Sequence, residues 1–175
     1  VGKKTIDGFE HKFYLTYPTV EMGLFNTLMK SVGKTRLAEW SSISEDKSDG
    51  KVCARPGNIK LGASNKTGGI VTPVLSALEG KALLKVTFKG CPYMELVNDP
   101  LTASVMVIST TEENTATIKD YSVVSSKDIT FSPELEWKEY SCEILADPTD
   151  RIAISSRRTS GTGQQRLLID DIKIE

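Results

Sequence analysis

The chain has 175 residues, of which 39% are hydrophobic and 26% charged, and this is the composition of one globular domain rather than of a disordered segment. Its 22 Lys and Arg residues nearly balance its 23 Asp and Glu residues, so a dedicated nucleic-acid binder, which carries a basic surplus, is not favoured. The longest unbroken apolar run covers only residues 105–108, far short of the ~20 residues that cross a bilayer. We therefore expect a single domain over residues 1–175, with no transmembrane segment and no nucleic-acid partner.

The first part of the chain predicts one strand and one helix. Residues 4–15 mix apolar and polar side chains as a strand does. Thr19 is a good N-cap, and Gly33 stands where the glycine that ends a helix belongs. The apolar residues between them have the spacing of an amphipathic helix: Leu24, Phe25, Leu28, Met29 and Val32. The sequence therefore predicts a short helix over about 20–32.

The rest of the chain has the pattern of short strands separated by turn residues. Apolar residues take alternate positions over 84–89, as in a strand with one buried face, whereas 103–108 is apolar nearly throughout, as in a central strand covered on both faces. About ten short strands at this spacing favour an antiparallel sandwich over a parallel sheet with crossover helices. We expect strands at 36–43, 51–54, 58–61, 70–72, 83–89, 103–110, 115–124, 128–131, 137–144, 151–156 and 167–174.

Motifs for catalysis are weak. His11 is the only histidine, so it alone would serve a nucleophilic triad or an imidazole–metal site, and we expect it in a solvated or edge position. The Gly33-Lys34-Thr35 run lacks the earlier glycine and the preceding strand of a phosphate-binding loop. Acidic residues crowd 134–150 without the compact carboxylate pair of a glycoside hydrolase. A protein that is not an enzyme is therefore favoured, and a glycoside-active enzyme is the less supported alternative.

The three cysteines, Cys53, Cys91 and Cys142, are widely spaced and form no CxxC motif. Each lies in or beside an apolar run, so we expect them to be small buried hydrophobic side chains. One disulfide plus one free thiol is the alternative.

The predicted last strand carries two adjacent carboxylates. Strict alternation places Asp170 on the apolar face together with Leu168, Ile172 and Ile174, and Asp171 on the opposite face. A carboxylate on an apolar face must be paired or must bind a metal, because bare burial is costly. A bulge at the Asp-Asp pair would change both assignments.

This ending, 168–174, together with Gly8-Phe9-Glu10 near the start, resembles the galactose-binding-like jelly-roll domains, to which carbohydrate-binding modules and MAM-type adhesion domains are similar. The segments 55–62 and 69–75 are similar to members found in surface proteins of Gram-negative gut bacteria. The resemblance covers most of the chain from about residue 5 onward. It implies an all-β, antiparallel jelly-roll β-sandwich, in which the helix at about 20–32 is an insertion.

The resemblance also implies a structural calcium ion that joins the first strand to the last. Carried over to this sequence, its ligands are Glu10 and Asp170, with Asp171 as the alternative to Asp170. Calcium takes several further oxygen ligands, including backbone carbonyls. The alternative is an Arg or Lys partner for Asp170 and no metal.

Sugar-binding sites in such domains use aromatic faces and a few polar side chains. Tyr93 lies at the start of a long connection, so it is the aromatic residue that we expect in the site. Trp40, Trp137 and Tyr140 lie in predicted strands, where we expect them to pack in the core.

Arginines supply the candidate polar contacts. Arg157 and Arg158 lie at the start of a Gly-rich connection, and Gln164 lies at its end. Arg55 precedes a Pro-Gly turn. Guanidinium groups at such a place would bind an acidic sugar or another carboxylate. The alternative is that the arginines offset the acidic stretch 134–150 on a neighbouring strand.

The sequence thus predicts a non-catalytic module that binds a polysaccharide or another glycan through Tyr93, Arg55, Arg157, Arg158 and Gln164. A structural or adhesive module that contacts a protein partner or a neighbouring domain is the alternative. The resemblance implies a place outside the cell or at the outer-membrane surface. Because the chain begins at Val1, a signal peptide or lipid-anchor cysteine would lie upstream of it.

Overall fold

The computed structural model describes residues 4–6, 9–11, 23–24, 40–55, 58–63, 66–93, 102–113, 115–157 and 166–175, and every structural statement below concerns these residues. For 4–6, 9–11, 23–24 and 54–55 it describes the backbone alone. The described residues form strands and no helix, so none of them lies in a helix long and apolar enough to cross a membrane.

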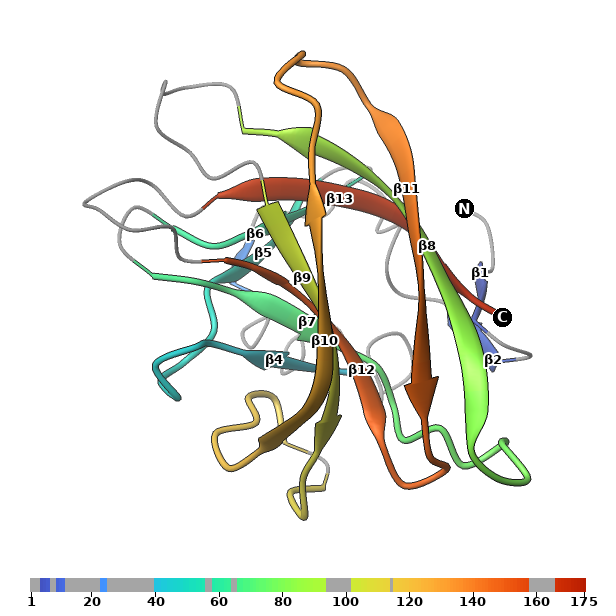
Figure 1. The fold of residues 1–175 in the computed structure, drawn as a ribbon. Helices are drawn as coiled ribbons and strands as arrows, with labels where there is room; N and C mark the ends of the chain where they lie inside the picture. Colours follow the sequence, from blue (N-terminus) through green and yellow to red (C-terminus); the bar gives the residue numbers. More distant parts are fainter. Residues whose placement is uncertain are drawn as a thin grey trace.

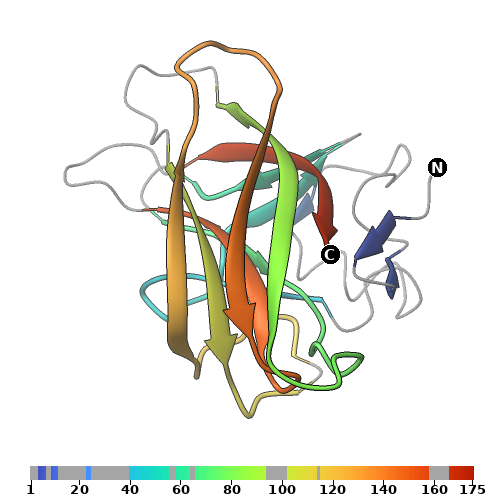
Figure 2. The same cartoon turned by 45° about the vertical axis from the view of Figure 1, so that its right-hand side comes forward.

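Two larger sheets face each other as two layers (Figures 1 and 2). The five-stranded sheet has the order β10 (Ser122–Thr130), β9 (Thr102–Ser109), β12 (Arg151–Ser156), β7 (Gly69–Val71) and β4 (Ser41–Ile43). The six-stranded sheet has the order β11 (Lys138–Ala146), β8 (Ala82–Pro92), β13 (Leu167–Ile174), β6 (Asn58–Leu61), β5 (Val52–Arg55) and β3 (Gly23–Leu24).

A separate pair, β1 (Lys4–Ile6) and β2 (Phe9–His11), lies beside β13 (Figure 2). Every paired strand in the described residues is antiparallel to its partner. The all-β antiparallel sandwich predicted from the sequence is therefore confirmed.

The predicted helix over about 20–32 is wrong at the two of its residues that the structure describes. Gly23 and Leu24 form the short strand β3, which pairs with Ala54 and Cys53 of β5. This pairing covers the outer edge of β5 and satisfies backbone groups that an edge strand leaves open. Glycine also weakens a helix by about 1 kcal/mol relative to alanine, so the local preference at this point is small. The other residues of the predicted helix lie outside the described ranges.

The core lies between the two sheets. In β8 the side chains of Leu84, Val86 and Phe88 point inward and are almost completely buried, which confirms the predicted alternation. In β9 both faces are covered: Val105 and Val107 belong to this core, whereas Ile108 belongs to a second cluster on the outer face of the five-stranded sheet. The near-continuous apolar run over 103–108 is thus explained by burial on both sides.

A β-bulge in β13 changes the predicted orientation of the two carboxylates. Along β13 Asp170 pairs with Lys89 and Lys173 with Thr87, so β13 holds one residue more than β8 over this stretch. Asp171 has a φ of 51°, a left-handed conformation that Asp tolerates better than most residues. One extra residue reverses the alternation, and the buried positions become Leu167, Ile169, Ile172 and Ile174.

The prediction that Asp170 shares a face with Ile172 and Ile174 is therefore wrong, because the bulge lies between them. Asp170 and Asp171 are both half-buried, outside the row of fully buried side chains. Without the bulge, a regular strand of this sequence could not bury all four residues. It would turn either Leu167 and Ile169 or Ile172 and Ile174 away from the core.

The cysteines form no disulfide: Cys53, Cys91 and Cys142 are all free. Cys91 is buried, as predicted, and the other two are half-buried. Burial raises the pKa of the Cys91 and Cys142 thiols, as expected for side chains used in packing rather than as reactive thiolates.

An aromatic cluster joins the two sheets where the chain crosses from β10 to β11. The ring of Phe131 stacks on Tyr140 at a centroid distance of 4.6 Å and lies 6.1 Å from the ring of Phe88. Phe131 occupies the space beside Gly90 in β8, where an added Cβ would lie 2.5 Å from the Phe131 Cζ. Only glycine at position 90 leaves room for this ring.

We predict that Gly90→Ala destabilises the fold by about 1–3 kcal/mol, because the new methyl group forces the Phe131 ring or the β8 backbone to move. Chemical denaturation of both proteins measures the difference in unfolding free energy. Gly80→Ala is the matched control, since an added Cβ there meets no atom within 4 Å. Equal stability of the two variants would contradict the packing role of Gly90.

Candidate functional site

Strand ends of both sheets gather at one end of the sandwich. We call it the upper end: β8, β10 and β12 end there and β9, β11 and β13 begin there (top and left of Figure 1). The register brings these strand ends together through the pairs Thr130–Thr102, Lys138–Gly90, Leu167–Pro92 and Ser156–Ala103. Side chains far apart in the sequence therefore meet at the upper end, as the loops of a β-sandwich commonly do.

Tyr93, which the sequence predicts as a ligand-binding residue, lies at the upper end, directly after β8. Two cations already lie over its ring: the Arg166 guanidinium carbon is 4.2 Å from the ring centroid and the Lys60 Nζ is 5.3 Å from it. Arg166 is itself buried. These contacts link the end of β8 to the start of β13 by cation–π attraction, so cations already contact the Tyr93 ring.

Arg157 also lies at the upper end, but its guanidinium is paired. It forms an ion pair with Asp128 of β10, and both side chains are roughly half exposed. The partner is therefore not in the acidic stretch 134–150 that the sequence suggested as the alternative. Arg151, in contrast, is buried and donates a hydrogen bond to the Thr72 carbonyl oxygen at 3.1 Å.

The other predicted ligand contacts do not all gather with Tyr93. Arg55 ends β5 and pairs with Asn58, while β6 runs along β13 from Leu61 to Ile59. Asn58 and its partner Arg55 therefore lie near the middle of β13, away from the upper end; the Arg55 side chain is not described. Arg158 and Gln164 lie outside the described residues.

Trp137 is the aromatic residue that sequence reasoning placed wrongly. Trp40 is buried and Tyr140 is half-buried against Phe131, as predicted, but Trp137 is 43% exposed. It lies just before β11, at the end of the connection 131–137, which we call the β10–β11 loop. The turn-forming Ser132-Pro133 pair ahead of it is the signal that would have placed it in a loop.

The β10–β11 loop is held in place by polar contacts. The Ser132 N–H donates to the Tyr140 hydroxyl at 2.9 Å, and the Ser132 hydroxyl donates to Glu134 Oε2 at 2.9 Å. Lys138 forms an ion pair with the same Glu134 carboxylate, which lowers the pKa of Glu134. The exposed apolar side chains of the loop are Leu135 and Trp137.

The residues predicted to bind calcium lie on β2 and β13, and β1 connects these two strands. Glu10 is in β2, which pairs with β1, and β1 contacts β13, the strand of Asp170 and Asp171; the Glu10 side chain is not described. Lys89 Nζ forms an ion pair with Asp171 Oδ2 at a distance of 2.8 Å. Close by, Asn58 precedes Ile59, which pairs with Ile169, and the buried Asn58 Oδ1 has no hydrogen-bond partner in the described part of the chain. Within that part, no group of three or more His, Cys, Asp or Glu residues forms a metal cluster.

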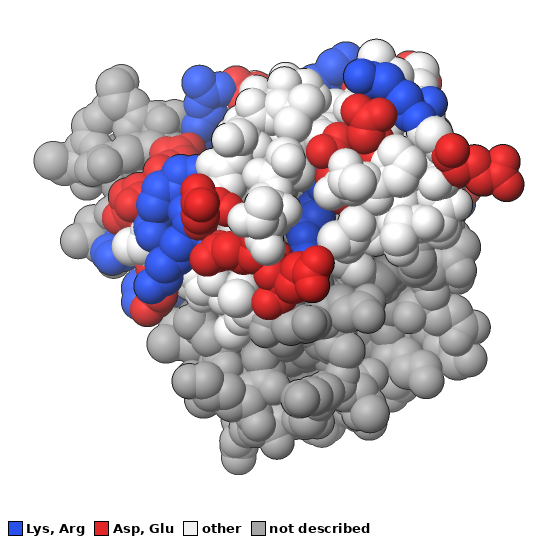
Figure 3. All heavy atoms as spheres, turned by 90° about the horizontal axis from the view of Figure 1, so that it is seen from below, with Lys and Arg blue, Asp and Glu red and all other residues white. Residues whose placement is uncertain are grey.

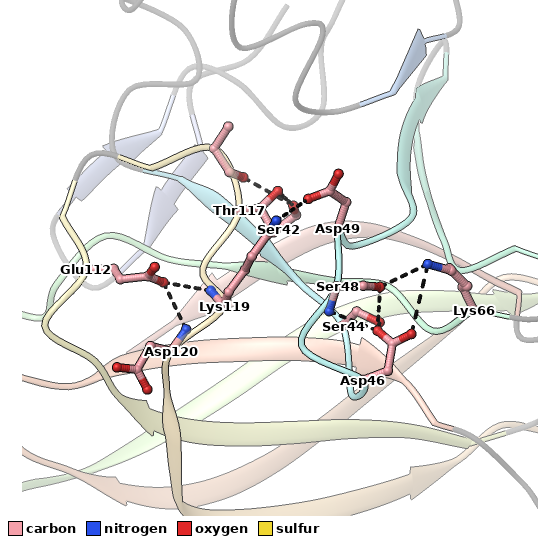
Figure 4. Close-up of polar contacts among 11 residues, drawn as sticks. Ser42, Ser44, Asp46, Ser48, Asp49, Lys66, Glu112, Thr117, Lys119 and Asp120 are labelled. Atoms are coloured by element: carbon pink, nitrogen blue, oxygen red, sulfur yellow. Dashed lines mark hydrogen bonds and ion pairs between the residues drawn. The ribbon is translucent and has the colours of Figure 1, made fainter.

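A polar network outside the upper end fixes the turn 44–50 (Figure 4). Asp46 Oδ1 accepts hydrogen bonds from the Ser48 hydroxyl at 2.5 Å, the Ser44 hydroxyl at 2.7 Å and the Ser48 N–H at 3.0 Å. Lys66 Nζ lies 4.0 Å from the other Asp46 oxygen. The hydrogen bonds from Ser48 and Ser44, with a smaller effect of Lys66, lower the pKa of Asp46 from its ordinary 3.8 to about 2.

The end of the sandwich opposite to the upper end shows charges of both signs side by side (Figure 3). There Lys81 Nζ lies 3.5 Å from Asp147 Oδ2. This described face therefore lacks the one-sided basic surface of a nucleic-acid binder.

Comparisons with known proteins show the fold. No protein-family model matches the sequence, and no curated protein matches it. A solved CBM4 structure has a TM-score of 0.51 with 15% identity, covering 81% of this chain and 97% of that chain. The K2 cleaved adhesin domain of Lys-gingipain has a TM-score of 0.49 with 18% identity, covering 91% of this chain and 95% of that chain. The K1 domain from Porphyromonas gingivalis W83 has a TM-score of 0.48 with 17% identity, covering 79% and 90%. The chain has the jelly-roll β-sandwich fold of a carbohydrate-binding module.

The Asp46 network predicts a pH-dependent contribution to stability. Because the folded pKa lies below the ordinary value, the contribution is complete above about pH 4 and is lost as the pH falls toward 2. Asp46→Ala should cost less than about 1 kcal/mol at pH 6, since the carboxylate is half exposed, and the difference from the wild type should shrink between pH 4 and pH 2. Denaturation curves over this pH range measure it, and a difference that stays constant down to pH 2 would contradict the assignment.

Proposed function

We propose that this protein is a non-catalytic carbohydrate-binding module that acts outside the cell and binds a glycan at the upper end. The fold shared with the CBM4 structure supports a module of this type. The single observation that carries the location is the exposed Trp137, on a loop that polar and aromatic contacts hold in place.

An exposed tryptophan on a fixed loop suits sugar binding for a physical reason. Its ring presents a large flat apolar surface, against which the C–H face of a pyranose packs while the sugar hydroxyls remain in water. The Ser132–Tyr140 hydrogen bond and the Phe131–Tyr140 stack already order the loop, so binding costs little further conformational entropy.

We predict that Trp137→Ala abolishes most glycan affinity and leaves the fold intact. A central aromatic contact of this kind contributes about 2 kcal/mol or more, which is a ~30-fold change in Kd. A thermal-shift panel of neutral and acidic polysaccharides identifies the ligand, since a glycan at ten times its Kd raises the Tm by roughly 3–5 °C. Titration calorimetry then gives Kd for the wild type and for the variant.

Leu83→Ala is the matched control for this experiment. Leu83 is also an exposed apolar side chain, 59% exposed, but it lies at the start of β8, at the opposite end of the sandwich. The control should bind like the wild type. If Trp137→Ala, shown to be folded by its circular dichroism, binds as tightly as the wild type, the site is not at the β10–β11 loop.

An adhesive or structural module is the second candidate. Leu83 and Leu145 are directly paired across β8 and β11, and both are more than half exposed on the outer face of the six-stranded sheet. An exposed apolar pair of this kind suits contact with a protein partner or a neighbouring domain. A polysaccharide panel with no thermal shift would favour this candidate.

We also propose that calcium joins β1 and β2 to β13, with Glu10 and Asp170 as side-chain ligands. Asp171, which forms an ion pair with Lys89, is the alternative to Asp170. The buried Asn58 Oδ1 beside the bulge fits as a further oxygen ligand, since calcium binds carboxylate and amide oxygens. When bound, the ion would stabilise the fold and take no part in a reaction.

We predict that calcium raises the Tm of chelator-treated protein and that Asp170→Asn removes most of this response. Binding to the folded state alone stabilises it by mass action, so the Tm should rise with calcium concentration. Magnesium is the control ion, because it holds its water shell and demands a smaller octahedral site. No bound calcium by elemental analysis, and no Tm change on adding it, would contradict the proposal.

A further inference from the structure

The ion pair between Arg157 and Asp128 spans the first part of β9 at the upper end. Arg157 follows β12, and its N–H donates to the Thr102 carbonyl oxygen at 3.3 Å. Asp128 belongs to β10 on the other side of β9, where it pairs with Ser104. Since Ala103 points into the core between the sheets, Ser104 and Asp128 face outward, and the ion pair lies on the outer face of the five-stranded sheet.

This contact changes what Arg157 offers to a ligand. A free guanidinium is a strong receptor for a carboxylate, because its parallel N–H groups match the two carboxylate oxygens. In this protein Asp128 takes that position. A glycan carboxylate would have to displace Asp128 and would leave a second negative charge beside it.

The other charged groups of the upper end do not compensate. Lys138 pairs with Glu134, and Glu136 is exposed on the same loop. Arg166, which is buried, and Lys60 both lie over the Tyr93 ring. These cations are therefore held by Glu134 or by the Tyr93 ring, which disfavours a ligand rich in uronic acids.

We propose that Asp128 is a specificity-determining residue: by pairing with Arg157 it makes the upper end select uncharged glycans and reject uronic-acid glycans. This inference rests on the proposed function. It reverses the sequence-based expectation that Arg157 binds an acidic sugar. That expectation did not include Asp128, because nothing in the sequence shows that Asp128 lies beside Arg157.

The test compares one polymer in two charge states. Neutral galactan, glucomannan and β-glucan are each used before and after oxidation of their C6 hydroxyls to carboxylates, and Kd is measured by calorimetry. We expect the wild type to bind the neutral form at least 10-fold more tightly than the oxidised form. Asp128→Asn should reduce the ratio of the Kd for the oxidised form to the Kd for the neutral form about 10-fold, because it releases Arg157. The double variant Asp128→Asn/Arg157→Gln should restore the preference for the neutral form.

Asp147→Asn is the matched control, since it removes the same charge from an ion pair at the opposite end of the sandwich and should leave the ratio unchanged. A wild type that binds both forms equally, or an Asp128→Asn variant that binds the neutral form with an unchanged ratio, overturns the inference while the proposed function stands. A wild type that binds neither form of any polymer overturns the proposed function and this inference with it.

Discussion

The contact between the Phe131 ring and the backbone at Gly90 determines how the sandwich closes at its upper end. A ring from the end of β10 packs directly on β8, in space that any Cβ at position 90 would fill. Tyr140 stacks on the same ring, and its hydroxyl accepts a hydrogen bond from the Ser132 N–H, so one aromatic cluster both joins the sheets and orders the β10–β11 loop. Trp137 lies on that loop and is exposed.

The bulge at Asp171 solves a similar problem in β13. A strand that pairs with β8 along its whole length must keep four large apolar side chains facing the core, yet the sequence places two adjacent carboxylates between the two apolar pairs. One inserted residue restores the inward alternation on both sides of the bulge and keeps the carboxylates out of the apolar core. The fold thus gathers carboxylates beside β6 and β1 for a packing reason, and the proposed calcium site would use them.

The architecture was predictable because alternation along a strand indicates which face is buried, as in β8, and a continuous apolar run indicates burial on both faces, as in β9. The surroundings of single residues were less predictable. Nothing local shows that Gly23 and Leu24 pair with β5, that Asp128 lies beside Arg157, or that cations cover Tyr93, since each depends on strands distant in sequence. Trp137 was misplaced because a tryptophan next to an alternating strand resembles a core residue when the loop before it is not recognised.

The central claim is that a glycan binds against Trp137 at the upper end, and acrylamide quenching of tryptophan fluorescence tests it most directly. The chain has two tryptophans, of which Trp40 is 1% exposed and Trp137 is 43% exposed, so nearly all quenching reports on Trp137. With the glycan found in the thermal-shift panel at saturation, we predict that the quenching constant falls toward that of a buried tryptophan. An unchanged quenching constant, under conditions where the thermal shift shows the glycan bound, would contradict it.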